Sequence, residues 1–273
     1  MFWPFQLCPA GPRVIRLLRG DIARCEADAI AVSANPNLEG TLRSNYWRFA
    51  GRRNADGAVR LAGGRSLADE TAKVSAHHPN PGHPGHPGHR AADALIPHSP
   101  WPQLRRSVGE LAPESAIVGR AGRSLRARWV VHCVAPDAVA RTADEHAAYL
   151  LEPTSYERGL SQRLQATYTA AISAATKAGA SSLAVPALGC GIRGFARDQA
   201  AAAAFRAAAA WLQTDSITQL RRLDFVILAD DVWAEWPRHA HAELGPPDGD
   251  TDLRLTDGDN EIHTWSEDVA GLV

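Results

Sequence analysis

The glycine-rich stretch at residues 182–195, SLAVPALGCGIRGF, constrains the fold more than any other part of this sequence. An apolar run of strand character ends at Pro186, a turn containing Gly189, Gly191 and Gly194 follows, and an alanine-rich, helix-forming tract begins at Arg197. This order collects unpaired backbone N–H groups and the positive end of a helix dipole at one place, which suits a phosphate group. The spacing matches neither G-x-G-x-x-G nor a P-loop, so an ordinary turn between a strand and a helix is the alternative.

Apolar runs and helical stripes alternate along the rest of the chain. Buried strands are expected at residues 14–18, 29–33, 115–118, 129–134, 183–186 and 224–229, and helices at 54–62, 67–74, 156–178 and 197–212. Alternation of this kind builds right-handed βαβ units, so it predicts an α/β fold with a mostly parallel sheet covered by helices on both faces. In such sheets ligands bind at the carboxyl ends of the strands.

The composition favours an intracellular protein with a single large core. The chain has 273 residues, of which 45% are hydrophobic and 22% charged, and its net charge of -1 provides no general attraction to nucleic acid or to an anionic membrane. Residues 1–12 are apolar but interrupted by prolines and lack a basic leader, so they are interpreted as an extension and not as a membrane anchor. The four cysteines show no C-x-x-C pairing, which argues against a zinc ribbon or disulfide framework and predicts a reducing compartment.

Two segments differ in composition from the expected domain at residues 13–241. A Pro-Gly-His repeat marks an insertion at about residues 77–102, and its histidines recur every three positions in a loop that fixes no ligand geometry, so no metal site is expected. Beyond residue 242 the chain is acidic and rich in proline and glycine. Residues 242–273 are therefore predicted to form a disordered or loosely attached tail.

Five short motifs stand in order at the ends of the expected elements: GDI at 20–22, SANPNL at 33–38, ADGAVRLAGG at 55–64, ARWVVHCVAP at 127–136 and PALGCGIRGF at 186–195. Together they resemble the macro domain family of ADP-ribose-binding proteins over roughly residues 14–236. The resemblance implies a three-layer α/β/α macro domain with a mixed, mostly parallel sheet, no cofactor, and ADP-ribose or an ADP-ribosylated protein as partner. It further implies hydrolysis of a mono-ADP-ribosyl or O-acyl-ADP-ribose linkage, with a non-catalytic reader or an ADP-ribose phosphate phosphatase as alternatives.

The resemblance also assigns ligand-binding residues. Asp21 would accept a hydrogen bond from the adenine amino group, assisted by the backbone of Ile22, and Phe195 would lie against the distal ribose. The backbone amides of one loop would wrap the diphosphate, and its residues are Gly189, Cys190, Gly191, Ile192, Arg193, Gly194 and Phe195. From residue type and position alone, Asp21 is expected to form a turn or cap a helix, and Phe195 is expected to lie in the core.

Two further residues carry the implied chemistry. Asn35 resembles the family asparagine that hydrogen-bonds the distal ribose, although an asparagine before Pro36 also suits a turn. Asp56 matches the aspartate that, in the hydrolase branch, orients or deprotonates a water near the anomeric carbon of that ribose. A carboxylate in the first turn of a helix also stabilises the helix, which is the alternative role for Asp56.

The sequence departs from the family pattern around the distal ribose. Ser33 replaces the first asparagine of the hydrolase motif, and residues 39–54 form an insertion with arginines and aromatic residues where relatives carry glycines. An arginine there can pair with a terminal phosphate or face solvent. His132 is expected in the core, and Cys190 is either a small turn residue or, as a thiolate at a helix N-terminus, a phosphatase nucleophile.

Overall fold

Seven strands form one sheet in the computed structural model, which describes residues 12–36, 38, 54–77, 114–122, 125–139, 143–214, 218–245 and 262–266. The strands, in chain order, are β1 (Val14–Arg19), β2 (Ala29–Ser33), β3 (Ser115–Arg120), β4 (Trp129–Val134), β5 (Ser182–Val185), β6 (Arg222–Ile227) and β7 (Ile262–Ser266). Their spatial order is β3-β4-β2-β5-β6-β1-β7. The five inner strands are mutually parallel, and the edge strands β3 and β7 are antiparallel, which confirms the predicted mixed, mostly parallel sheet.

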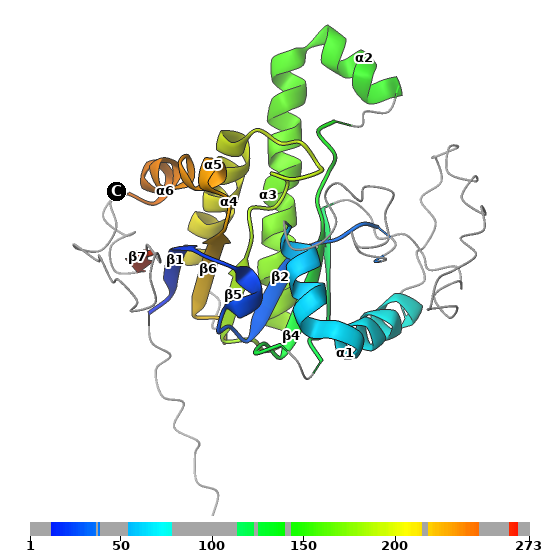
Figure 1. Ribbon diagram of the computed structural model, residues 1–273. Helices are drawn as coiled ribbons and strands as arrows, with labels where there is room; N and C mark the ends of the chain where they lie inside the picture. Colours follow the sequence, from blue (N-terminus) through cyan, green and yellow to red (C-terminus); the bar gives the residue numbers. More distant parts are fainter. Residues whose placement is uncertain are drawn as a thin grey trace, which may run out of the picture.

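Helices cover both faces of this sheet (Figure 1). They are the short 3-10 helix η1 (Ile22–Arg24), α1 (Ala55–His77), α2 (Ala143–Leu151), α3 (Pro153–Lys177), α4 (Arg197–Leu212), α5 (Asp230–Trp233) and α6 (Trp236–Leu244). Helix α1 and η1 pack on one face, and α3 and α4 pack on the other, with α6 against α4. The three-layer α/β/α architecture is therefore as predicted.

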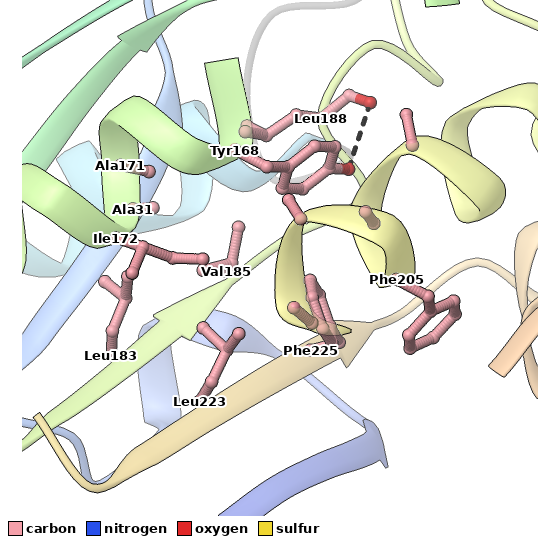
Figure 2. Close-up of a cluster of buried hydrophobic side chains, with 14 of the residues drawn as sticks. Ala31, Tyr168, Ala171, Ile172, Leu183, Val185, Leu188, Phe205, Leu223 and Phe225 are labelled. Carbon is pink, nitrogen blue, oxygen red and sulfur yellow. Dashed lines mark hydrogen bonds between the residues drawn. The ribbon is translucent and has the colours of Figure 1, made fainter. Parts of the chain in front are cut away.

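The larger hydrophobic core lies between the sheet and helices α3 and α4 (Figure 2). Small alanine side chains on the buried side of α4 let this helix approach the sheet closely, and edge-to-face aromatic contacts fill the remaining space around Phe225, which meets Tyr168, Phe205 and Trp236. The Tyr168 hydroxyl donates to the backbone oxygen of Leu188 at 3.3 Å. The core thus holds the start of the glycine-rich loop in place.

Helix α1 consists of two helical segments joined at Gly64, whose backbone (φ 54, ψ -146) is not helical. A left-handed φ is available to glycine without steric cost, so the Gly63-Gly64 pair allows the bend. The sequence predicted two separate helices at residues 54–62 and 67–74, and the structure places both within this one bent element. The bend keeps the first turn of α1 near β2 while its second half packs against β3.

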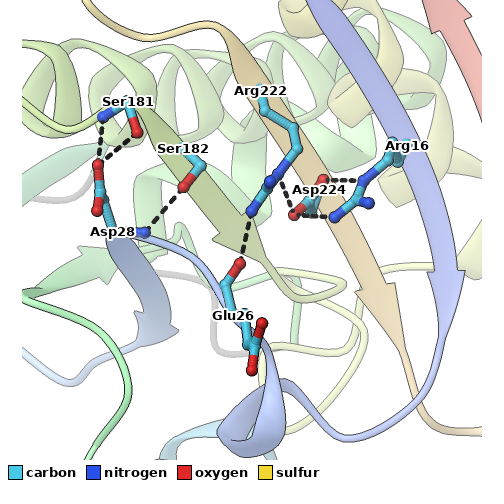
Figure 3. A network of polar contacts seen from close by, with 7 residues as sticks. All are labelled: Arg16, Glu26, Asp28, Ser181, Ser182, Arg222 and Asp224. Carbon is cyan, nitrogen blue, oxygen red and sulfur yellow. Dashed lines mark hydrogen bonds and ion pairs between the residues drawn. The ribbon is translucent and has the colours of Figure 1, made fainter.

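A polar network near the amino ends of the strands is buried at its centre (Figure 3). Asp224 on β6 is 1% exposed and accepts from Arg16 on the neighbouring β1 at 2.7 and 2.8 Å and from Arg222 at 3.0 Å. Between β2 and β5, the Asp28 carboxylate accepts from the backbone N–H and the hydroxyl of Ser181, and the hydroxyl bond lowers the pKa of Asp28. These contacts fasten the end of the sheet opposite the carboxyl ends, where ligands bind in this fold class.

The tail prediction is wrong for the residues that the structure describes. Helix α6 extends to Leu244, past the expected boundary at residue 242, and β7 pairs antiparallel with β1 within the segment expected to be loose. An edge strand gains its hydrogen bonds from a distant neighbour, so an acidic local composition does not reveal it. The N-terminal extension up to residue 11, the insertion at 39–53, the repeat from residue 78 onward and residues 246–261 lie outside the described residues.

Candidate functional site

The carboxyl ends of the parallel strands meet at one edge of the sheet. There β2 leads into residues 34–38, β4 into 135–139, β5 into the glycine-rich loop 186–196, and β6 into the start of α5. Except for the carboxylate of Asp56, which comes from the first turn of α1, every residue predicted to bind ligand or act in catalysis lies in a segment that follows a strand. The fold therefore gathers the predicted residues at the edge where α/β sheets bind ligands.

Two backbone hydrogen bonds shape the glycine-rich loop. The Phe195 N–H donates to the Gly189 oxygen at 3.1 Å, and the Gly194 N–H donates to the Gly191 oxygen at 3.0 Å. Gly189 and Gly194 have left-handed φ angles of 88° and 69°. In the described part of the chain, no hydrogen bond uses the backbone N–H groups of residues 191–193. Successive free N–H groups directly before a helix N-terminus form a concave backbone site for an anion.

The segment after β4 closes against this loop. The Ala138 N–H donates to the Arg193 oxygen at 2.8 Å, and the Arg193 guanidinium pairs with the Asp137 carboxylate at 3.1 Å. The left-handed φ of Gly194 favours glycine, and a Cβ atom there would lie 2.1 Å from the exposed Val139 side chain, which would have to move. Arg193 is thus engaged in fixing the loop. Asp137 was not predicted from the sequence, where a single acidic residue in a loop is no signal.

Two side chains of the loop turn toward the core. Phe195 is 5% exposed and packs against Gly189 and Leu164, which favours its role as a core residue over contact with the ribose. Burial raises the pKa of the Cys190 thiol to about 12. A protonated thiol is a poor nucleophile, so this burial argues against the alternative of a Cys190 thiolate in a phosphatase mechanism. Burial outweighs the positive charge of Arg197, which acts in the opposite direction, and only the fold reveals that burial.

Asp21 and Ile22 follow β1. The Asp21 carboxylate accepts from the Ala23 N–H at 2.9 Å and caps η1, and Ile22 is buried. The turn-forming role foreseen for Asp21 is therefore present, and the adenine contact stays a prediction. Leu228, which follows β6, is 55% exposed at the same edge.

Asn35 lies in the turn after β2, and Asp56 lies in the first turn of α1. The Asn35 oxygen accepts from the Leu38 N–H at 3.0 Å. The Asn54 side chain accepts from the Gly57 N–H at 2.7 Å and caps the helix in whose first turn Asp56 lies. Asp56 is 2% exposed and forms an ion pair with a residue one turn further along α1, at 2.9 Å. The carboxylate is thus held rigidly at the strand-end edge.

That partner is Arg60, a residue that the sequence reasoning did not single out, although an aspartate followed four positions later by an arginine is a readable helix-pair signal. Its guanidinium also donates to the Leu38 oxygen at 3.0 Å. His132 on β4 lies nearby and is 1% exposed, as expected for a core residue. Burial, helped by the positive charge of Arg60, lowers the pKa of His132 to about 4, so the imidazole is neutral at pH 7.

No group of three or more metal-ligating side chains occurs among the described residues, and the histidines of the Pro-Gly-His repeat fall outside them. No helix in the described ranges has the length and apolar character needed to cross a membrane.

Comparison with known proteins points to one family. The sequence model of the macro domain family matches residues 101–204 of this chain. A macro domain-containing protein of Streptomyces coelicolor is 26% identical over 220 residues, which cover 81% of this chain and 96% of the relative. The Oceanobacillus iheyensis macrodomain with ADP has a similar fold, with a TM-score of 0.56 at 16% identity over 84% of this chain and 90% of that one. The Trypanosoma brucei macrodomain in complex with ADP-ribose has a TM-score of 0.52 at 18% identity, covering 82% of this chain and 68% of that one.

Proposed function

Because this chain belongs to the macro domain family, we propose that its strand-end edge binds ADP-ribose and hydrolyses a mono-ADP-ribosyl or O-acyl-ADP-ribose linkage. The observation that carries the binding part is the backbone of residues 191–193, whose N–H groups have no acceptor within the described ranges and precede the N-terminus of α4. A diphosphate supplies the acceptors that such a loop lacks. The similar folds that contain ADP or ADP-ribose support the same ligand.

The other parts of the ADP-ribose contact residues along the same edge of the sheet. Asp21 and Ile22 at the end of β1 take the adenine, next to the exposed side chain of Leu228. Asn35 at the end of β2 holds the distal ribose, and the loop between them in the sheet, after β5, holds the diphosphate. The ligand therefore extends across the carboxyl ends of four neighbouring strands, from β1 through β6 and β5 to β2.

Hydrolysis rests on Asp56. With a mono-ADP-ribosyl ester, its carboxylate takes a proton from a water that attacks the anomeric carbon of the distal ribose, the bond from that carbon to the acceptor oxygen breaks, and ADP-ribose and the acceptor carboxylate leave. With O-acyl-ADP-ribose, the same water attacks the acyl carbonyl carbon, the bond from that carbon to the ribose oxygen breaks, and ADP-ribose and the free acid leave. A buried carboxylate at a helix N-terminus is suited to this role because it is held in one geometry. The competing function is that of a reader, which binds the modification without cleaving it, and the ion pair with Arg60 favours it because one carboxylate oxygen of Asp56 is already hydrogen-bonded and less accessible to a water.

Calorimetry tests the binding part. ADP-ribose should bind with a micromolar Kd, roughly -8 kcal/mol, and adenosine, which lacks the diphosphate, should bind much more weakly. Gly191→Glu places a carboxylate against the diphosphate and should abolish measurable binding in a folded protein, because nothing within 4 Å of this glycine obstructs the new side chain. Gly191→Ala is the matched control and should bind nearly as wild type does. Equal affinity for both ligands, or unaltered affinity in Gly191→Glu, would contradict the proposed site.

Turnover separates the hydrolase from the reader. Asp56→Ala should lower kcat on mono-ADP-ribosylated protein or O-acetyl-ADP-ribose by about a hundredfold or more, the scale of losing a general base, while ADP-ribose binding persists. A wild-type protein that binds ADP-ribose but releases none from these substrates would be a reader. Full turnover in Asp56→Ala would remove Asp56 from the reaction.

A further inference from the structure

The Arg60 guanidinium connects two segments that carry the proposed chemistry. Its Nε atom donates to Asp56 Oδ1 at 2.9 Å, and its Nη2 atom donates to the backbone oxygen of Leu38 at 3.0 Å. The side chain is 13% exposed, so solvent screens neither contact strongly. One planar group with donors in a fixed fork therefore sets the distance between the first turn of α1 and the loop after β2.

Leu38 has an unusual backbone that depends on such a contact. Its φ of 57° lies in the left-handed region, which is costly for a residue with a side chain, and Leu38 is 3% exposed. Its N–H donates to the Asn35 oxygen and its own oxygen accepts from Arg60. A continuous chain of hydrogen bonds thus runs from Asn35 through Leu38 and Arg60 to Asp56.

His132 is a titratable group close enough to interact electrostatically with both Arg60 and Asp56. Its two ring nitrogens have no hydrogen-bond partner among the described residues. The imidazole is buried and uncharged at neutral pH, so it does not compete for the Asp56 carboxylate. A charge on His132 therefore does not weaken the ion pair of Arg60 with Asp56 at neutral pH.

From this geometry we infer that Arg60 is a positioning residue, which holds the Asp56 carboxylate in register with the turn that carries Asn35. The inference rests on the proposed hydrolase function, in which Asp56 orients the water and Asn35 holds the ribose. A displacement of about 1 Å in a reacting group costs about a hundredfold in rate. Loss of the guanidinium therefore acts on the chemical step and not on the diphosphate contacts, which come from the glycine-rich loop.

The kinetic test uses three variants of the full chain with O-acetyl-ADP-ribose or mono-ADP-ribosylated protein as substrate. Arg60→Ala should lower kcat about a hundredfold with KM changed less than threefold. Arg60→Lys should recover only part of kcat, because an ammonium group keeps the charge but not the fork. Millimolar guanidinium ion should restore turnover in Arg60→Ala by tenfold or more. Arg158→Ala, which removes an exposed arginine on α3, is the control. Its kcat and KM should match those of the wild type, both with and without added guanidinium ion.

A second readout does not depend on activity. In Arg60→Ala the Leu38 amide proton should exchange with solvent at least tenfold faster than in wild type, because the Leu38 oxygen loses its hydrogen bond from Arg60 and the turn opens more often. Asp56→Ala keeps the hydrogen bond from Arg60 to the Leu38 oxygen and should leave the exchange rate within threefold of wild type. Unchanged exchange together with unchanged kcat in Arg60→Ala would overturn the inference.

The outcomes also separate this inference from the function on which it rests. If Asp56→Ala loses turnover while Arg60→Ala keeps it, the hydrolase function stands and the role of Arg60 is refuted. If the wild-type protein binds ADP-ribose without cleaving either substrate, both are refuted. A KM that rises in Arg60→Ala with constant kcat would show that Arg60 serves ligand binding, which also overturns the positioning role.

Discussion

Gly189→Ala should destabilise the protein by about 1–4.5 kcal/mol. The left-handed φ of 88° costs a residue with a side chain about 1–2 kcal/mol. The new Cβ would lie 2.9 Å from the Phe195 ring and 3.2 Å from Leu164, both buried, and overpacking of this kind costs about 1–3 kcal/mol. The lower flexibility of the unfolded chain offsets about 0.4–1 kcal/mol of this loss.

Gly191→Ala is the matched control in the same loop. Its φ is not left-handed, and a Cβ there meets nothing within 4 Å, so its stability should stay within about 0.5 kcal/mol of wild type. Urea unfolding followed by far-ultraviolet circular dichroism gives both values, and the melting temperature of Gly189→Ala should fall by about 2–18 °C. If the two variants were equally stable, the loop would not be shaped by its contact with Phe195, and the argument from steric fit would be refuted.

Two further predictions concern buried charged or titratable groups. Arg13→Met should cost roughly 2–4 kcal/mol in urea unfolding, because Arg13 is buried and donates to the backbone oxygens of Trp211, Leu212 and Thr214 at the end of α4; a loss under 0.5 kcal/mol would contradict this capping role. His132→Leu should reduce the acid sensitivity of the fold: the pKa of His132 lies below its ordinary 6.5 at about 4, so the unfolded chain binds the proton more readily and wild-type stability falls as pH drops from 6.5 toward 4. Parallel stability curves of the two proteins over that pH range would rule out this source of acid sensitivity.

The sequence predicted the centre of the sheet well because its signals there are local. The apolar runs of β2 and β4 and the alanine-rich tract of α4 match the structure from first to last residue. Each is bounded by a turn residue or by a break in apolar periodicity, so neighbouring residues are enough to define it. Helix α2 and strand β7 were not predicted. Helix α2 buries none of its residues, and β7 forms by pairing with β1, so the position of each depends on contacts outside its own sequence.

The candidate site shows the same division. Asp56, Asn35 and the glycine-rich loop could be identified because their motifs are contiguous and resemble a known family. The protonation and hydrogen bonding of each side chain could not be predicted, because they depend on contacts between distant segments. The Cys190 thiol is a case: a position before a helix N-terminus predicts a lowered pKa, whereas burial raises the pKa to about 12. The contact of Arg60 with Leu38 joins residues separated by 22 positions and a segment whose sequence has no regular pattern.

The position of β1 between β6 and β7 sets the order in which the protein can assemble during synthesis. The ion pair between Arg16 and Asp224 joins residues 208 positions apart, and β7 is later still. While the ribosome makes the intervening chain, β2, β3 and β4 can already pair, but β1 has no partner strand. Its apolar residues Ile15 and Leu17, fully buried in the finished sheet, stay accessible until β6 is made. The N-terminal strand is therefore the segment at which a nascent chain of this protein is most prone to aggregate and at which a holding chaperone has most to protect.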